Sequence, residues 1–122
     1  MHILLIDDEG PLVDVLKVRL QASAHHTATV IYEVDDEESL SSQLAEIQPE
    51  AVVLDFGMDI EGDTVYRWIK AWKQDVKIVF YTCYADTAEP RAKMLAAGAT
   101  EREIVRKTGV GNDMSQLLMV LQ

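Results

Sequence analysis

A short apolar segment, Ala51–Leu54, ends abruptly on Asp55 and constrains the fold of this chain more than any other feature. Pro49 precedes the segment, and Gly57 and Gly62 follow it. An apolar segment of this length between such breaks is typical of a strand buried on both faces of a parallel sheet. We therefore expect Asp55 to lie at the carboxyl end of a central strand, where open α/β sheets bind ligands.

The rest of the chain alternates between strand-like and helix-like spacing of its apolar residues. We expect strands at His2–Ile6, Thr27–Val34, Ala51–Leu54, Lys77–Tyr81 and Glu103–Arg106, each followed by a helix. This alternation predicts a parallel sheet with helices on both faces. With right-handed crossovers, the fold class is a three-layer, doubly wound, five-stranded α/β sheet of order 2-1-3-4-5.

Several helices have recognisable first residues. Acidic residues favour a helix N-terminus, and short polar side chains can cap one. We expect the second helix to begin within the acidic run Asp35–Glu38, the third at Asp63 or Thr64, the fourth at Thr87 and the last at Asn112 or Asp113. Trp68 and Trp72 fall on the apolar face of the third helix, so we assign them to the core.

Length, charge and cysteine content limit the possible functions. The 122 residues fit one domain, residues 1–122. A formal net charge of -10 argues against nucleic acid or an anionic membrane as a direct partner, and favours a basic protein surface or a divalent cation. The single cysteine, Cys83, excludes an internal disulfide, and we expect its side chain to pack. We find no signal peptide and no apolar run of membrane-spanning length, so we expect a cytoplasmic protein.

Acidic residues also follow the first strand, at Asp7, Asp8 and Glu9. In the expected strand order the first and third strands are neighbours, so Asp7, Asp8 and Asp55 meet at one edge of the sheet. Clustered carboxylates repel one another unless a cation intervenes. Hard oxygen ligands with open positions suit Mg²⁺, and the backbone carbonyl of Gly57 can add a ligand.

Asp55 in such a site has two possible uses, as a metal ligand or as a nucleophile that takes a phosphoryl group. Phosphoryl transfer depends on positioning and on neutralising charge. A hydroxyl and an ammonium near the phosphoryl oxygens would help. Thr82 ends the fourth strand and Lys107 follows the fifth, so both side chains can reach the same place.

Four motifs occur in order along the chain: LLIDDE, VVLDFGM, VFYTCYA, and LAAGA followed by VRK. Through them the whole chain resembles the receiver domain of bacterial two-component response regulators, which has a flavodoxin-like fold. The resemblance implies a sensor histidine kinase or phosphotransfer protein as phosphodonor, and an output partner that binds the fourth helix, fifth strand and fifth helix. It also implies Asp55 as phosphoacceptor, Asp7 and Asp8 as metal-pocket residues, the Gly57 carbonyl as a metal ligand, and Thr82 and Lys107 as switch residues.

The chain departs from the family pattern after the third and fifth strands. The departures are Asp59 in place of a proline, Gly62 one residue early, Ile104 in place of an aromatic residue and Thr108 in place of a proline. The segment Gly98–Lys107 is also longer than usual. We expect Ile104 to be a fixed, inward-facing residue, and Glu101–Glu103 to form a charged loop that responds to phosphorylation.

Of three alternatives to phosphorylation-dependent signalling, only the pseudo-receiver remains open. A pseudo-receiver would use the same fold for protein interaction without phosphate; the altered region of the fifth strand favours it, and the complete set of Asp7, Asp8 and Asp55 opposes it. A phosphatase with an aspartate nucleophile needs Asp-x-Asp after the first strand, whereas this chain has Asp7, Asp8 and Glu9. A flavin carrier would need a loop rich in Ser, Thr and Gly at that point. We therefore expect a chain that acts on its own aspartate and is not otherwise an enzyme.

Overall fold

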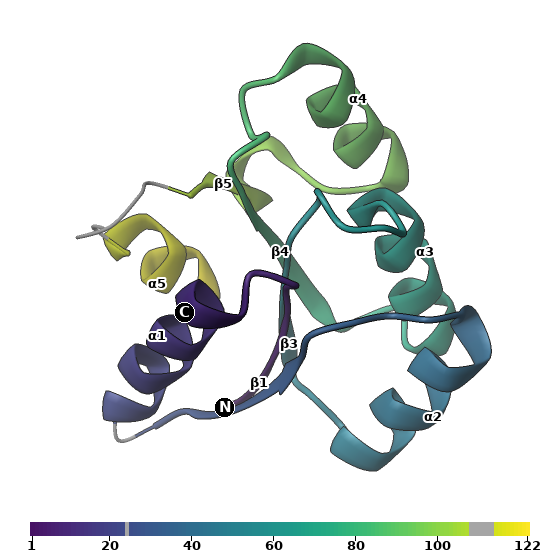
Figure 1. The fold of residues 1–122 in the computed structure, drawn as a ribbon. Helices are drawn as coiled ribbons and strands as arrows, with labels where there is room; N and C mark the ends of the chain where they lie inside the picture. Colours follow the sequence, from purple (N-terminus) through teal and green to yellow (C-terminus); the bar gives the residue numbers. More distant parts are fainter. Residues whose placement is uncertain (24, 108–113) are drawn as a thin grey trace.

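A five-stranded parallel sheet of order β2-β1-β3-β4-β5 forms the centre of the molecule (Figure 1). The computed structural model describes residues 1–23, 25–107 and 114–122. The observed strand order confirms the expected order 2-1-3-4-5. The strands are β1 (His2–Ile6), β2 (Thr27–Ile31), β3 (Ala51–Leu54), β4 (Lys77–Thr82) and β5 (Ile104–Arg106).

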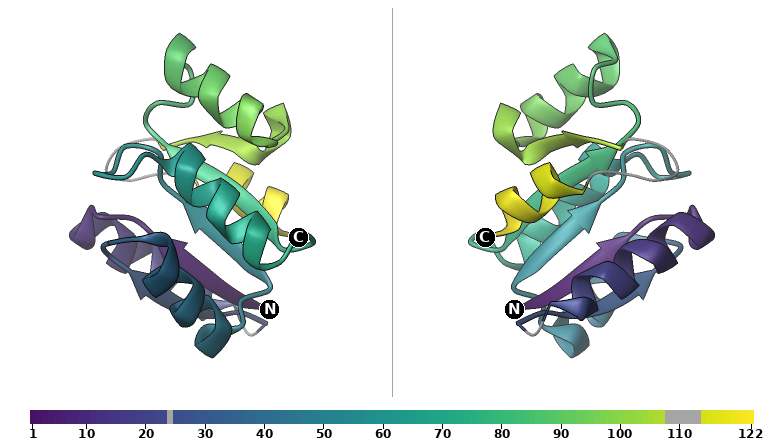
Figure 2. Two further views of the ribbon diagram at one scale, coloured as in Figure 1. Left: turned by 90° about the vertical axis from the view of Figure 1, so that its right-hand side faces the viewer. Right: turned by 90° about the vertical axis from the view of Figure 1, so that its left-hand side faces the viewer.

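Helices cover both faces of the sheet and make a three-layer molecule (Figures 1 and 2). α1 and α5 lie on one face, and α2, α3 and α4 lie on the other. None of the described helices has both the length and the apolar character that a membrane crossing requires. Their bounds are α1 (Gly10–Ala22), α2 (Glu37–Ile47), α3 (Gly62–Trp72), α4 (Ala88–Ala97) and α5 (Ser115–Leu121).

The alternation of side chains along each strand divides the core in two. On β1, Ile3 and Leu5 pack under α1 and α5, whereas Leu4 and Ile6 pack under the other three helices. Every residue of β3 is buried, which agrees with its expected position between two neighbouring strands. Burial on both faces explains why these strands are apolar throughout.

Some element bounds differ from those expected. β2 ends at Ile31 rather than Val34, because its partner β1 ends at Ile6, which pairs with Ile31. α3 begins at Gly62 rather than at Asp63 or Thr64. The expected caps Asn112 and Asp113, and the departure at Thr108, lie outside the described residues.

Other local expectations are met. Asp36 is the N-cap of α2, and its Oδ1 accepts a hydrogen bond from the Ser39 backbone N–H at 2.7 Å. Trp68 and Trp72 are half-buried against the core. Cys83, by contrast, is exposed, so its expected packing role is wrong.

The segment before β5 is a short 3-10 helix, η1 (Glu101–Glu103), and the expectation of a loop there is wrong. Its ends are held by a capping box, in which the Glu103 carboxylate accepts hydrogen bonds from the Thr100 backbone N–H at 2.9 Å and from the Thr100 hydroxyl at 3.0 Å. Ile104 follows and is buried in the core, as expected.

Candidate functional site

The register between β1 and β3 brings acidic residues together at the carboxyl edge of the sheet. Ile6 pairs with Leu54, so Asp7 and Asp55 are the next residues on adjacent strands. The Asp55 backbone N–H donates to the Ile6 carbonyl at 3.0 Å and extends the pairing by one step. Carboxylate oxygens of Asp7, Asp8 and Asp55 lie within 4.8 Å of one another. The predicted acidic site is therefore present, with Asp7 and Asp55 buried and Asp8 exposed.

Backbone N–H groups fix the orientation of the two buried carboxylates. Asp7 Oδ1 accepts a hydrogen bond from the Glu9 backbone at 2.9 Å, and Asp55 Oδ1 accepts one from the Phe56 backbone at 2.8 Å. In each residue the bond to a following N–H leaves the other oxygen, Oδ2, directed at a common cation, the Lys107 ammonium.

Lys107 reaches the acidic edge from β5. Thr82 pairs with Arg106, and the next backbone N–H, that of Lys107, donates to the Thr82 carbonyl at 2.9 Å. The Lys107 side chain is only 8% exposed. Its Nζ lies 2.7 Å from Asp7 Oδ2, 3.5 Å from Asp55 Oδ2 and 3.5 Å from Glu9 Oε1.

Burial and charge oppose each other at this ion cluster. Burial alone would lower the pKa of Lys107, but the close contact with the Asp7 carboxylate and the charges of Asp55, Asp7 and Glu9 outweigh it, so the pKa is raised. Lys107 therefore stays positively charged at neutral pH. Burial raises the pKa of Asp7, and the neighbouring Lys107 ammonium reverses only part of that effect.

The site keeps an excess of negative charge. The carboxylates of Asp7, Glu9 and Asp55 contact the ammonium of Lys107, and Asp8 adds a fourth carboxylate beside Asp7 and Asp55. Mg²⁺ prefers oxygen ligands that carry negative charge, and it usually keeps some of its water molecules. The exposed carboxylate of Asp8 leaves this site open to water. The residues present therefore fit a magnesium ion held by Asp7, Asp8 and Asp55.

Thr82 lies at the end of β4, beside the lysine. Its side chain is fully buried, and its Oγ1 accepts a hydrogen bond from the Tyr84 backbone N–H at 3.2 Å. A hydroxyl that accepts one bond still has its own proton to donate. The structure thus places Thr82 and Lys107 at successive strand ends, as the sequence predicts.

The ring of Tyr84 covers Gly57. A Cβ atom on Gly57 would lie 2.5 Å from Cε2 of Tyr84, so only glycine leaves room for the ring in this position. The same ring meets Phe56 edge to face, with 6.2 Å between the centroids. The two residues that follow Asp55, Phe56 and Gly57, therefore form the surface on which the Tyr84 ring packs.

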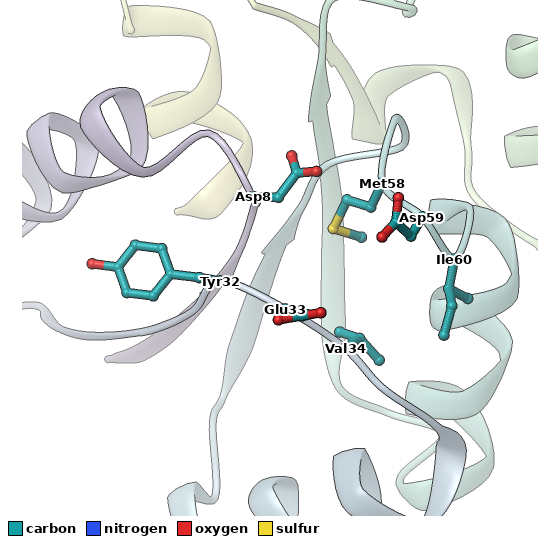
Figure 3. A pocket seen from close by; sticks show the side chains of 7 residues that line it. All are labelled: Asp8, Tyr32, Glu33, Val34, Met58, Asp59 and Ile60. Atoms are coloured by element: carbon teal, nitrogen blue, oxygen red, sulfur yellow. The ribbon is translucent and has the colours of Figure 1, made fainter.

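A pocket of about 260 Å³ opens beside the acidic site (Figure 3). Asp8 belongs to both the pocket and the site. Asp59 lines it at the place where the family pattern has a proline. Glu33 had no predicted role, although its position just after the second strand places it at this edge of the sheet. The pocket is lined by Asp8, Tyr32, Glu33, Val34, Met58, Asp59 and Ile60.

The fold and the site together define a class: a doubly wound parallel α/β domain with an acidic cluster and a buried lysine at the carboxyl ends of β1, β3 and β5. The family model of the response regulator receiver domain matches residues 3–117, so the chain belongs to that family. It is therefore a receiver domain of the kind found in two-component response regulators. A comparison with curated proteins found no match.

Solved structures of receiver domains have the same fold. The signal receiver domain of a DNA-binding response regulator from Colwellia psychrerythraea 34H is 20% identical, with a TM-score of 0.76, covering 99% of this chain and 94% of that one. A CheY-like receiver domain protein from Methanospirillum hungatei JF-1 is 18% identical, with a TM-score of 0.77 and coverage of 98% and 89%. A Burkholderia pseudomallei response regulator, solved with a phosphorylated aspartic acid, calcium ion and citrate, is 16% identical, with a TM-score of 0.77 and coverage of 99% and 66%.

Proposed function

We propose that Asp55 accepts a phosphoryl group in a reaction that requires Mg²⁺, and that phosphorylation changes the affinity of the domain for an output partner. The observation that supports this most directly is the position of the Lys107 ammonium, 2.7 Å from Asp7 and 3.5 Å from Asp55. A buried cation held beside the acceptor carboxylate can pair with the oxygens of an incoming phosphoryl group.

The chemistry that we propose is a transfer from a phosphorylated histidine. An oxygen of Asp55 attacks phosphorus, the phosphorus–nitrogen bond breaks, and the imidazole leaves with a proton taken from solvent. A bound Mg²⁺ at Asp7, Asp8 and Asp55, with the Gly57 carbonyl as a further ligand, would neutralise charge on the phosphoryl oxygens. Lys107 then exchanges part of its contact with Asp55 for a phosphoryl oxygen, and the Thr82 hydroxyl donates to another.

The partners follow from this chemistry. A sensor histidine kinase or a phosphotransfer protein would supply the phosphoryl group, and an output protein or domain would read the change. These partners operate in the cytoplasm, where we place this domain. Its chemistry is confined to forming and hydrolysing its own aspartyl phosphate. The phosphorylated aspartic acid of the Burkholderia structure is an example of this modification in a domain of the same fold.

Mass spectrometry after incubation with acetyl phosphate tests the proposal. We expect a gain of one phosphoryl mass that requires Mg²⁺ and is absent in Asp55→Asn. Asp75→Asn, which changes an exposed aspartate at the opposite edge of the sheet, is the matched control and should still be phosphorylated. No mass gain in the folded wild-type protein would favour the pseudo-receiver alternative, in which the domain binds partners without using phosphate.

A further inference from the structure

The pocket beside the acidic site carries negative charge that the protein does not neutralise. Within residues 1–23, 25–107 and 114–122, neither Asp8, Glu33 nor Asp59 forms an ion pair. Other acids nearby are paired: Asp7, Glu9 and Asp55 contact Lys107, and Glu61 contacts Lys93 at 3.0 Å. The lining residues include neither lysine nor arginine.

The three carboxylates belong to three separate loops. Asp8 follows β1, Glu33 follows β2 and Asp59 follows β3 (Figure 3). Between them lie apolar side chains, those of Val34, Met58 and Ile60. Val34 is buried, whereas the other two are half-buried and pack on the core from its surface. The pocket therefore combines an apolar wall with an acidic rim.

This combination selects one kind of occupant. A hydrated Mg²⁺ ion needs oxygen atoms around it, and the apolar wall supplies none. Small-molecule sites usually have volumes of about 300–1,000 Å³, so 260 Å³ is closer to the space for one long side chain. An arginine side chain has an aliphatic stem that can lie on Met58 and Ile60, and a weakly hydrated planar head that can pair with carboxylates. Lysine has a similar stem but a more strongly hydrated head.

We propose that this pocket binds an arginine side chain of the protein that delivers the phosphoryl group. Asp8 is shared with the acidic site, so an arginine seated here comes from a protein docked directly over Asp55. The proposal rests on the proposed function for the identity of that protein. Asp59 makes the pocket a feature of this chain, because the family pattern has an uncharged proline at that place.

An NMR titration of the full chain with n-propylguanidinium tests the pocket without any phosphodonor. n-Propylurea is the matched probe, with the same shape and no charge. Saturating Mg²⁺ is present throughout, so that Asp8 is engaged by the metal and the readout depends on Glu33 and Asp59. The variant is Glu33→Gln with Asp59→Asn. The control is Glu46→Gln with Asp75→Asn, which removes the same charge from exposed residues at the other edge of the sheet.

We expect saturable shifts of the Val34, Met58 and Ile60 amides with propylguanidinium and none with propylurea. The pocket variant should bind at least fivefold more weakly, and the control should bind like the wild type. Equal binding to wild type and pocket variant, or equal shifts with both probes, would overturn the proposal. Displacement of the probe when Mg²⁺ is raised well above the concentration that saturates the acidic site would also overturn it, because the pocket would then be a second metal site.

The phosphorylation assay separates this result from the proposed function. Acetyl phosphate carries no arginine, so it should phosphorylate Asp55 in the pocket variant as it does in the wild type. If the probe binds the pocket while Asp55 takes no phosphoryl group, the assignment of the arginine to a phosphodonor is overturned. If Asp55 is phosphorylated while the probe does not bind, the pocket proposal fails and the proposed function stands.

Discussion

Side chains at the acidic edge compete for the same ammonium group. Lys107 lies closer to Asp7 than to Asp55, and its third contact is Glu9. The sequence placed Lys107 near Asp55 because both follow strand ends, but it gave no reason to expect the shorter contact with Asp7. Both carboxylates use Oδ1 for a backbone N–H and present Oδ2 to the lysine, so the shorter contact depends on where the folded loops place the two side chains.

Tyr84 gives a prediction about the lifetime of the phosphoryl group. Hydrolysis needs a water molecule in line with phosphorus, and the Tyr84 ring covers the Gly57 side of the site. We expect Tyr84→Ala to speed dephosphorylation several-fold, which corresponds to about 1 kcal/mol in the barrier. Decay of the phosphorylated protein, followed by mass spectrometry, gives the rate. Tyr84→Phe keeps the ring and should decay like the wild type; similar rates in all three proteins would exclude a covering role.

At the level of the elements, the loop from β3 to α3 depends on one close approach. A Cβ on Gly62 would lie 2.4 Å from the Asp55 carbonyl oxygen and 2.7 Å from the Phe56 Cα, and these are backbone atoms that cannot rotate away. The Gly62 backbone N–H also donates to the Phe56 carbonyl at 2.9 Å. This approach sets the start of α3, and it positions the strand end that carries Asp55.

We expect Gly62→Ala to destabilise the protein by about 1–3 kcal/mol, because the loop must move to accept the methyl group. Gly10→Ala is the control, since the nearest atom to its Cβ would be a Tyr32 ring carbon at 3.9 Å. That change should cost no more than about 0.5 kcal/mol. Urea unfolding measures the free energy of unfolding of both variants and of the wild type. Equal free energies of unfolding for the two variants would show that the loop from β3 to α3 accommodates the methyl group without loss of stability.

The start of α3 and the form of η1 differ in how far the sequence could have predicted them. Gly62 is required by contact with Asp55 and Phe56, which only the folded loop reveals. In η1 the signal was present, since Thr100 and Glu103 have the spacing of a capping box. The strand ends were predictable because an apolar run stops on a polar residue. The pocket beside the acidic site was not predictable, because its lining comes from three loops that are separated along the chain.

η1 is attached to α4, and this attachment gives a prediction about the output side. The Arg91 guanidinium donates to the Ala85 carbonyl at 3.0 Å and lies 3.9 Å from Glu101. We expect the beryllofluoride phosphate mimic to change amide hydrogen exchange most between Thr82 and Lys107. Arg91→Gln should reduce the change in η1 and leave the change around Asp55 intact. Protection confined to residues that touch the mimic would mean that this face does not transmit the signal.

For the molecule as a whole, the crowded carboxylates predict a dependence of stability on Mg²⁺. Binding to the folded state alone stabilises it by about 2.7 kcal/mol when the ion is at 100 times its Kd. We expect the melting temperature to rise with Mg²⁺ and the rise to be smaller in Asp8→Ala, whose exposed side chain can be removed without opening the core. Asp75→Ala should respond like the wild type. A melting temperature that stays constant over a wide titration would rule out the metal site.

The ribosome makes the two buried aspartates of the acidic site well before it makes the lysine that pairs with them. The buried acids come from positions 7 and 55, and their internal counter-ion comes from position 107. At about 5–20 residues per second, roughly 3–10 s pass between the synthesis of Asp55 and that of Lys107. During that interval the growing chain holds its acceptor aspartate without the strand that brings the lysine. Under the proposed function, a nascent chain therefore lacks the ammonium group that would pair with a phosphoryl oxygen until β5 has been added.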